Sequence, residues 1–158
     1  MLSIYKNKQR WRHPGEKALR EVLYNPQLDQ HERRSYLKEV VDKKSTVCAS
    51  IALLRCKNLP SDIQDELVLV IRRLQNLKAS HEVLSQCQTL TRGQAAFLVY
   101  VIVKKLRSNA RRSSFSDRTP EYYAANLIKY RSDVLGQELS NRLNKALIES
   151  RERVRPLS

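Results

Sequence analysis

The histidines are the first candidates for chemistry, because metal binding and acid–base catalysis both use imidazole. His13, His31 and His81 are spread along the chain, and none lies at metal-ligand spacing from a cysteine or an acid. His81 is followed by Glu82, but the second histidine of a zinc-binding helix is missing. No nucleophile elbow, cysteine–histidine signature or apolar carboxylate pair occurs. We therefore predict no enzyme activity, no metal and no cofactor.

Basic residues are the positive feature, with 30 Lys and Arg against 16 Asp and Glu and a net charge of +14. Between Arg92 and Arg118 the one acid is Asp117. Three interpretations of this surface are open: it binds nucleic-acid phosphates, it docks an acidic protein, or it is the solvated end of a buried helix. We predict a partner or nucleic-acid site formed by Lys104, Lys105, Arg107, Arg111 and Arg112.

The elements that must position these residues are helices. Apolar residues recur every three or four positions along the chain, whereas strand-like alternation extends over no useful length. Only 3 glycines leave little room for hairpin turns or a phosphate-cradling loop. We predict an all-α bundle of about five or six helices without internal repeats. The expected helices cover roughly 15–24, 29–57, 61–88 and 91–112, and a last stretch from 119 divides near Ser132.

Local signals mark where these helices begin. Asp29 is an N-cap residue, and Thr91 with Gln94 has the spacing of a capping box, as does Ser61 with Gln64. Thr119 is followed by a proline and an acid, which is typical of a helix start. The stretch 95–103 is apolar on every side, so we expect its helix at the centre of the bundle.

The chain is expected to comprise a basic arm over residues 1–13 and a single helical domain over residues 14–158. Its longest apolar run has nine residues, from Ala95 to Val103, where about twenty are needed to span a membrane. The N-terminus lacks the apolar core of a signal peptide. Cys48, Cys56 and Cys87 are an odd number without a Cys-x-x-Cys pair, so we predict free thiols in an intracellular compartment.

Leucines on the last helix suggest self-association. Charged residues separate them at a spacing suited to helix-on-helix packing, and a stripe from Leu67 to Leu77 is a second candidate. The alternative is that both stripes close the core of one chain. We predict a homodimer interface on the last helix, formed by Leu135, Leu139, Leu143 and Leu147.

Residues 61–158 carry a family resemblance. The matching pieces are Leu67, Ile71-Arg72, Leu74, Gln88, Leu90, Thr91-Arg92 and Gln94-Ala95, then VYVIVKKLR over 99–107 and the pair Tyr122-Tyr123. This part of the chain resembles the C proteins of paramyxoviruses, especially the morbillivirus branch. The apolar run before the Lys-Leu-Arg motif is shorter here than in the family, and the basic loop over 109–118 is longer.

The resemblance implies a non-enzymatic viral accessory protein with a helical C-terminal domain. Such a virulence factor modulates viral RNA synthesis through the viral polymerase and phosphoprotein, and antagonises host innate-immunity and interferon responses. It implies an intracellular location, in the host cytoplasm with the nucleus as an alternative. The charge supports a different interpretation, a basic helical nucleic-acid-binding structural protein that is capsid-like or ribosome-associated. Co-elution with nucleic acid at moderate salt separates the two.

Overall fold

The computed structural model describes residues 12–108 and 119–154, and all regular structure in these ranges is helical. The all-α prediction is confirmed, with eight described helices instead of the five or six expected. The basic arm predicted over 1–13 lies mostly outside the described residues. The helices are α2 (Glu16–Tyr24), α3 (Gln30–Asp42), α4 (Thr46–Arg55), α5 (Ser61–Arg73), α6 (Leu77–Gln86), α7 (Arg92–Arg107), α8 (Pro120–Tyr130) and α9 (Ser132–Val154).

The extra helices arise from two chain breaks that the sequence analysis missed. The helices expected over 29–57 and 61–88 are each divided, at Lys44 and at Gln75. These residues adopt left-handed φ values of 54° and 50°, which end one helix and redirect the chain. The next helix starts at once, capped by the side chains of Ser45 and Asn76. A break of this kind is usually marked by glycine, so neither site was recognisable.

Helix boundaries recur at intervals of 31 residues through three successive pairs of a short and a long helix, α2–α3, α4–α5 and α6–α7. The short helices end at Tyr24, Arg55 and Gln86, and the long helices begin at Gln30, Ser61 and Arg92. Lys44 and Gln75 keep the same spacing. The expectation of no internal repeat is therefore wrong for the positions of the helices. The register is lost after α7, where the connection to α8 is longer.

Three predicted helix starts are confirmed. The Asp29 side chain accepts from the backbone N–H of Glu32, and Thr91 does the same for Gln94, each within a reciprocal capping box. Thr119 accepts from the N–H of Tyr122, with Pro120 in the first turn. These caps work over three residues, which is why sequence alone located them.

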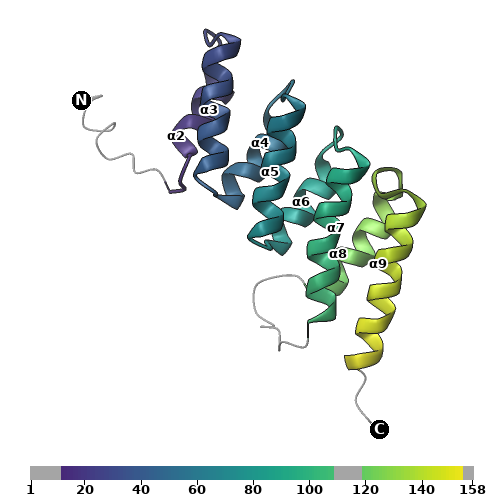
Figure 1. The fold of residues 1–158 in the computed structure, drawn as a ribbon. Coiled ribbons are helices and arrows are strands. Elements are labelled where there is room, and N and C mark those ends of the chain that lie inside the picture. The colour runs from purple at the N-terminus through teal and green to yellow at the C-terminus, as the bar shows by residue number, and fades with distance from the viewer. Residues whose placement is uncertain (1–11, 109–118, 155–158) are drawn as a thin grey trace. The chain divides into compact units, whose positions relative to one another are not determined.

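Residue contacts divide the chain into two compact units, Met1–Val70 and Ile71–Ser158. In the first unit, α2 packs against α3 and α4, and α3 also contacts α4 (Figure 1). Leu19, Leu37 and Val40 are among the residues buried there. The prediction of one domain over 14–158 stays a prediction, because this division does not measure whether either unit is stable alone.

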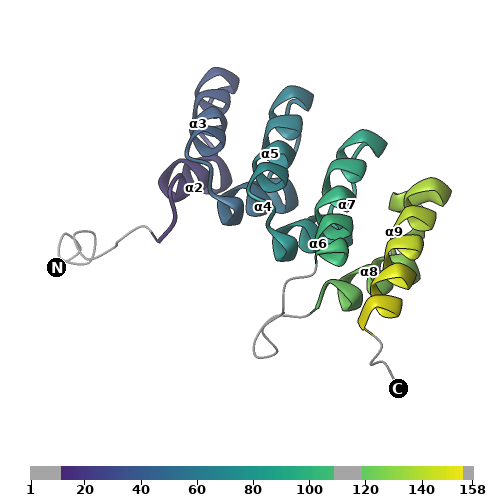
Figure 2. The same ribbon diagram turned by 60° about the horizontal axis from the view of Figure 1, so that its bottom comes forward.

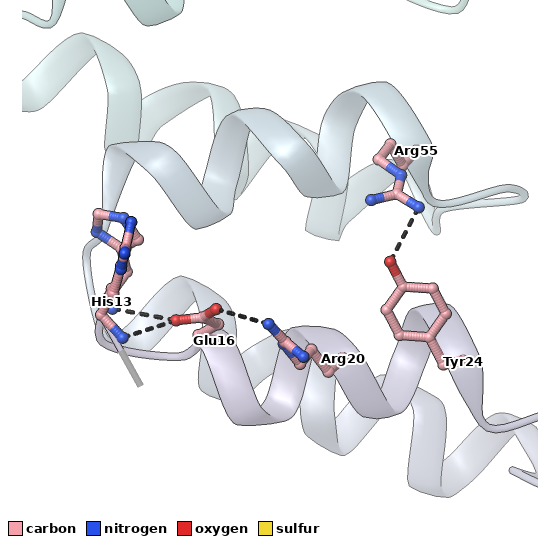
Figure 3. A network of polar contacts seen from close by, with 6 residues as sticks. His13, Glu16, Arg20, Tyr24 and Arg55 are labelled. Carbon is pink, nitrogen blue, oxygen red and sulfur yellow. Dashed lines mark hydrogen bonds and ion pairs between the residues drawn. The ribbon is translucent and has the colours of Figure 1, made fainter. Parts of the chain in front are cut away.

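Glu16 organises the start of α2. Its carboxylate accepts from the backbone N–H groups of Arg12 and His13 at 2.8 and 3.3 Å and from Arg20 at 3.3 Å (Figure 3). Desolvation acts to raise the pKa of Glu16, but these hydrogen bonds outweigh it and hold the pKa below its ordinary value. The Glu16 carboxylate therefore ties the residues just before α2 to its first turn, while Gly15 at the N-cap has no side chain to accept a hydrogen bond.

In the second unit, α7 contacts each of the other three helices, α6, α8 and α9. Figure 2 shows α7 beside the long α9, with the shorter α6 and α8 next to one another. The expectation of a central helix is thus met within this unit. It is not buried all round, however, because Phe97 and Tyr100 are 36% and 44% exposed.

No helix in the described ranges is both long and apolar enough to cross a membrane.

Candidate functional site

A basic groove lies between α7 and α9. It has a volume of about 640 Å³ and is lined by Tyr100, Val103, Lys104, Arg107, Asn141, Arg142 and Lys145. We call this set the α7–α9 groove. Four of its lining residues are cations and none is an acid. A groove with one sign of charge concentrates counter-charged ligands near its surface.

Helical spacing brings the α7 wall together. Positions 100, 103, 104 and 107 recur every three or four residues, so they share one side of the helix. The remaining faces of α7 are buried, including Leu98, Ile102 and Leu106. Burial of those faces fixes the rotation of α7 and leaves Tyr100, Lys104 and Arg107 exposed, whereas Val103 is 5% exposed.

The α9 wall is arranged in the same way. Asn141 and Lys145 are four residues apart on α9, and both are exposed, as is Arg142. Leu139, Leu143 and Leu147 alternate with them and are at most 6% exposed. The contact between α7 and α9 therefore holds the two rows of cations on either side of one groove.

Two acids beside the groove pair with two of its four cations, so the groove keeps a net positive charge. Glu149 approaches Arg107 at 3.9 Å, and Glu138 pairs with Arg142 at 3.3 Å one turn earlier on α9. Both ion pairs are largely exposed. Exposed ion pairs contribute little to stability, and salt screens them. Arg153 adds a further cation at the end of α7, where it donates to the carbonyls of Leu106 and Arg107 at 2.8 and 2.9 Å.

Exposed aromatic rings continue the α7 side of the groove. Arg72 places its guanidinium 4.7 Å from the ring centre of Phe97 and 4.8 Å from that of Tyr100. This cation–π contact holds the two rings in position at the surface. Tyr100 itself lines the groove, so one aromatic ring and four cations lie in the same depression.

The predicted basic site is only partly reproduced. Lys104 and Arg107 line the groove, whereas Lys105 is half-buried and is not among its lining residues. Arg111 and Arg112 lie outside the described residues. Sequence reasoning missed Asn141, Arg142 and Lys145, because no local pattern links α9 to a residue about 40 positions earlier. The exposed positions between the α9 leucines were the available signal.

The predicted self-association stripe is not exposed. Leu135, Leu139, Leu143 and Leu147 are between 0 and 6% exposed within a single chain. They close the core of the second unit, where α9 packs on α7 and α8, which corrects the premise of an exposed leucine stripe. Of the second candidate stripe, Leu67 and Ile71 are also buried, while Leu74 is 53% exposed. The homodimer itself stays a prediction.

Binding is the chemistry that the groove supports. Its lining contains amide, phenol, aliphatic and cationic groups, and no carboxylate, imidazole or thiol. Within residues 12–108 and 119–154, no cluster of three or more His, Cys, Asp or Glu could hold a metal ion. In the same residues Cys48, Cys56 and Cys87 form no disulfide.

Fold and site together define an all-α protein with a cationic groove suited to binding. No protein-family model matches the chain, and no curated protein or solved structure has significant similarity to it. The resemblance to paramyxovirus C proteins therefore stays a prediction.

Proposed function

We propose that this protein is a non-enzymatic binding protein whose α7–α9 groove holds single-stranded nucleic acid, specifically RNA. The observation that carries this proposal is the convergence of Lys104, Arg107, Arg142 and Lys145 in one groove that has no acidic lining residue. Lys and Arg neutralise backbone phosphates and release condensed counterions, which supplies sequence-independent affinity.

Tyr100 favours a single strand over a duplex. Its ring is 44% exposed and lies among the cations, so an unpaired base could stack on it while neighbouring phosphates contact the lysines. Bases inside a duplex are already stacked on one another and cannot do this. Aromatic stacking next to a basic groove is the usual arrangement for binding a single strand without sequence preference.

A charge-reversal experiment tests the proposal. The double variant Lys104→Glu/Lys145→Glu removes two groove cations at exposed positions, and a fluorescently labelled uridine oligomer of about twelve nucleotides reports binding by anisotropy. We expect affinity to fall at least tenfold at physiological salt, while the melting temperature changes little because both side chains are exposed.

The matched control is Lys38→Glu/Lys78→Glu, which makes the same change in net charge at exposed positions outside the groove. The control variant should lose less than threefold in affinity for the uridine oligomer. Tyr100→Ala should weaken binding at least fivefold without a change of charge, since a stacked base contributes roughly 1–3 kcal/mol. Equal losses in the groove and control variants would reduce the effect to net charge and contradict the proposal.

The resemblance to paramyxovirus C proteins supports a second candidate, a regulator of viral RNA synthesis that acts through the polymerase and phosphoprotein and antagonises innate immunity. The observation that favours it is that Val103, Lys104 and Arg107, from the resembling motif, line the groove. Under this proposal the groove holds an acidic segment of the viral complex. The same groove variant would then lose a co-purified phosphoprotein but keep its affinity for the uridine oligomer.

A further inference from the structure

A second pocket lies within the first unit. It has a volume of about 800 Å³ and is walled by the end of α2, the first turns of α3 and the segment that follows α4. Its lining residues are Val22, Leu23, Gln30, Arg33, Arg34, Leu37, Arg55, Cys56, Lys57, Asn58 and Pro60. We call it the α2–α4 pocket. It lies within the size range of sites that enclose a small ligand or a few side chains.

Four cations line this pocket, and an acid neutralises the charge of one of them, Arg34. Arg34 pairs with Asp62, which is outside the lining, and a hydrogen bond from Arg34 lowers the pKa of that carboxyl. Arg33 donates to the backbone carbonyls of Lys57 and Asn58, which are neutral acceptors. These two bonds occupy two of its five N–H donors. The charge of Arg33 is therefore not cancelled.

Arg55 and Lys57 supply the other two charges. The Arg55 guanidinium donates to the Tyr24 hydroxyl at 3.1 Å and lies 5.6 Å from the centre of that ring (Figure 3). Its partner is a neutral phenol, so the contact positions the cation without neutralising it. Lys57 has an exposed side chain. No aspartate or glutamate is among the lining residues.

The remaining wall is aliphatic. Val22, Leu23, Leu37 and Pro60 provide it, together with Cys56. Burial raises the pKa of the Cys56 thiol to about 11, although Arg33 and Arg55 act against this, so the thiol is neutral and adds to the apolar wall. No aromatic ring is part of the lining. An occupant thus meets aliphatic surface and three cations.

We infer that the α2–α4 pocket binds a short acidic peptide of a partner protein, with an aliphatic side chain against the apolar wall and flanking carboxylates on Arg33, Arg55 and Lys57. Arginine recognises carboxylates through parallel hydrogen bonds, which suits this lining. A nucleic acid is disfavoured because no ring is available to stack a base. A second copy of this chain is disfavoured because both copies carry a net charge of +14.

A labelled peptide tests this inference. The probe is a fluorescein-labelled peptide of about twelve residues that alternates Asp or Glu with Leu, measured by anisotropy with the full chain. We expect Arg55→Glu/Lys57→Glu to weaken binding at least tenfold. Lys57→Glu alone should weaken binding at least threefold. Lys57 accepts a hydrogen bond from Arg33 through its backbone carbonyl, which this substitution keeps, so the test stays valid if the double variant unfolds.

Three controls separate this site from others. Lys38→Glu/Lys78→Glu should leave peptide affinity within threefold, and so should Lys104→Glu/Lys145→Glu in the α7–α9 groove, so this test can fail while the proposed function holds. A peptide with serine in place of leucine should bind at least fivefold more weakly. The inference is overturned if the wild type does not bind the peptide, if Lys57→Glu binds it normally, or if the uridine oligomer displaces it.

Discussion

At the scale of single residues, arginines in this chain have two roles: they stabilise the fold, and they line the sites proposed to bind partners. Arg33, Arg131 and Arg153 each donate from both terminal nitrogens to two backbone carbonyls at or after a helix end. The last carbonyls of a helix have no partner within it, and these guanidinium groups supply one. Part of the excess basic charge therefore stabilises the fold, in addition to any contact that the same arginine makes with a partner.

Arg131 offers the clearest test of this structural role. Its side chain is 12% exposed and spans the carbonyls of Ser85 and Cys87 after α6. Arg131→Lys keeps the charge but cannot reach both carbonyls, so we expect a loss of about 1–3 kcal/mol and a melting temperature lower by several degrees. Arg142→Lys is the control, since that side chain is 47% exposed and pairs only along α9. Similar melting temperatures for both variants would refute the role.

At the scale of elements, helix ends decide how the chain is divided. Asp29, Thr91 and Thr119 cap the starts of their helices, because each side chain accepts a hydrogen bond from the backbone N–H three residues later. Lys44 and Gln75 end theirs by backbone conformation alone. For a residue with a Cβ, the left-handed region costs roughly 1–2 kcal/mol, and packing of the adjoining helices has to offset that cost.

Glycine at these breaks should therefore stabilise the protein. Lys44→Gly and Gln75→Gly each remove the Cβ strain but add unfolded-state entropy, for a net gain of about 0.5–1 kcal/mol measured by thermal or urea unfolding. Lys43→Gly is the matched control one position earlier. Lys43 has a right-handed φ of −75°, so glycine there should destabilise by up to about 1 kcal/mol. Destabilisation at Lys44 would show that the left-handed backbone is not strained.

At the scale of the whole molecule, a net charge of +14 attracts polyanions to any surface, so affinity alone does not identify a site. The α7–α9 groove gathers four cations around one depression together with the Tyr100 ring, whereas no aromatic ring lines the α2–α4 pocket. A gathered set neutralises a countable number of phosphates, and that number appears in the salt dependence of binding.

Salt titration should report this number. With four groove cations engaged, the logarithm of affinity for a uridine oligomer should fall with the logarithm of salt concentration at a slope of about −3, because each neutralised phosphate of a single strand contributes about −0.7. Lys104→Glu/Lys145→Glu should make the slope shallower by at least 1, whereas the Lys38→Glu/Lys78→Glu control should leave the slope unchanged. A slope near that of the wild type in the groove variant would place the bound strand elsewhere on the chain.

The sequence by itself determined the helical class, the capped helix starts and the exposed positions of Lys104 and Arg107, because periodicity and capping act over three or four residues. Only tertiary structure decided that α9 completes the groove with Arg142 and Lys145, and that the leucines between them are core. Those outcomes depend on the packing of α7 against α9, which joins residues about 40 positions apart. A leucine stripe has the same pattern whether its own chain or a second copy covers it.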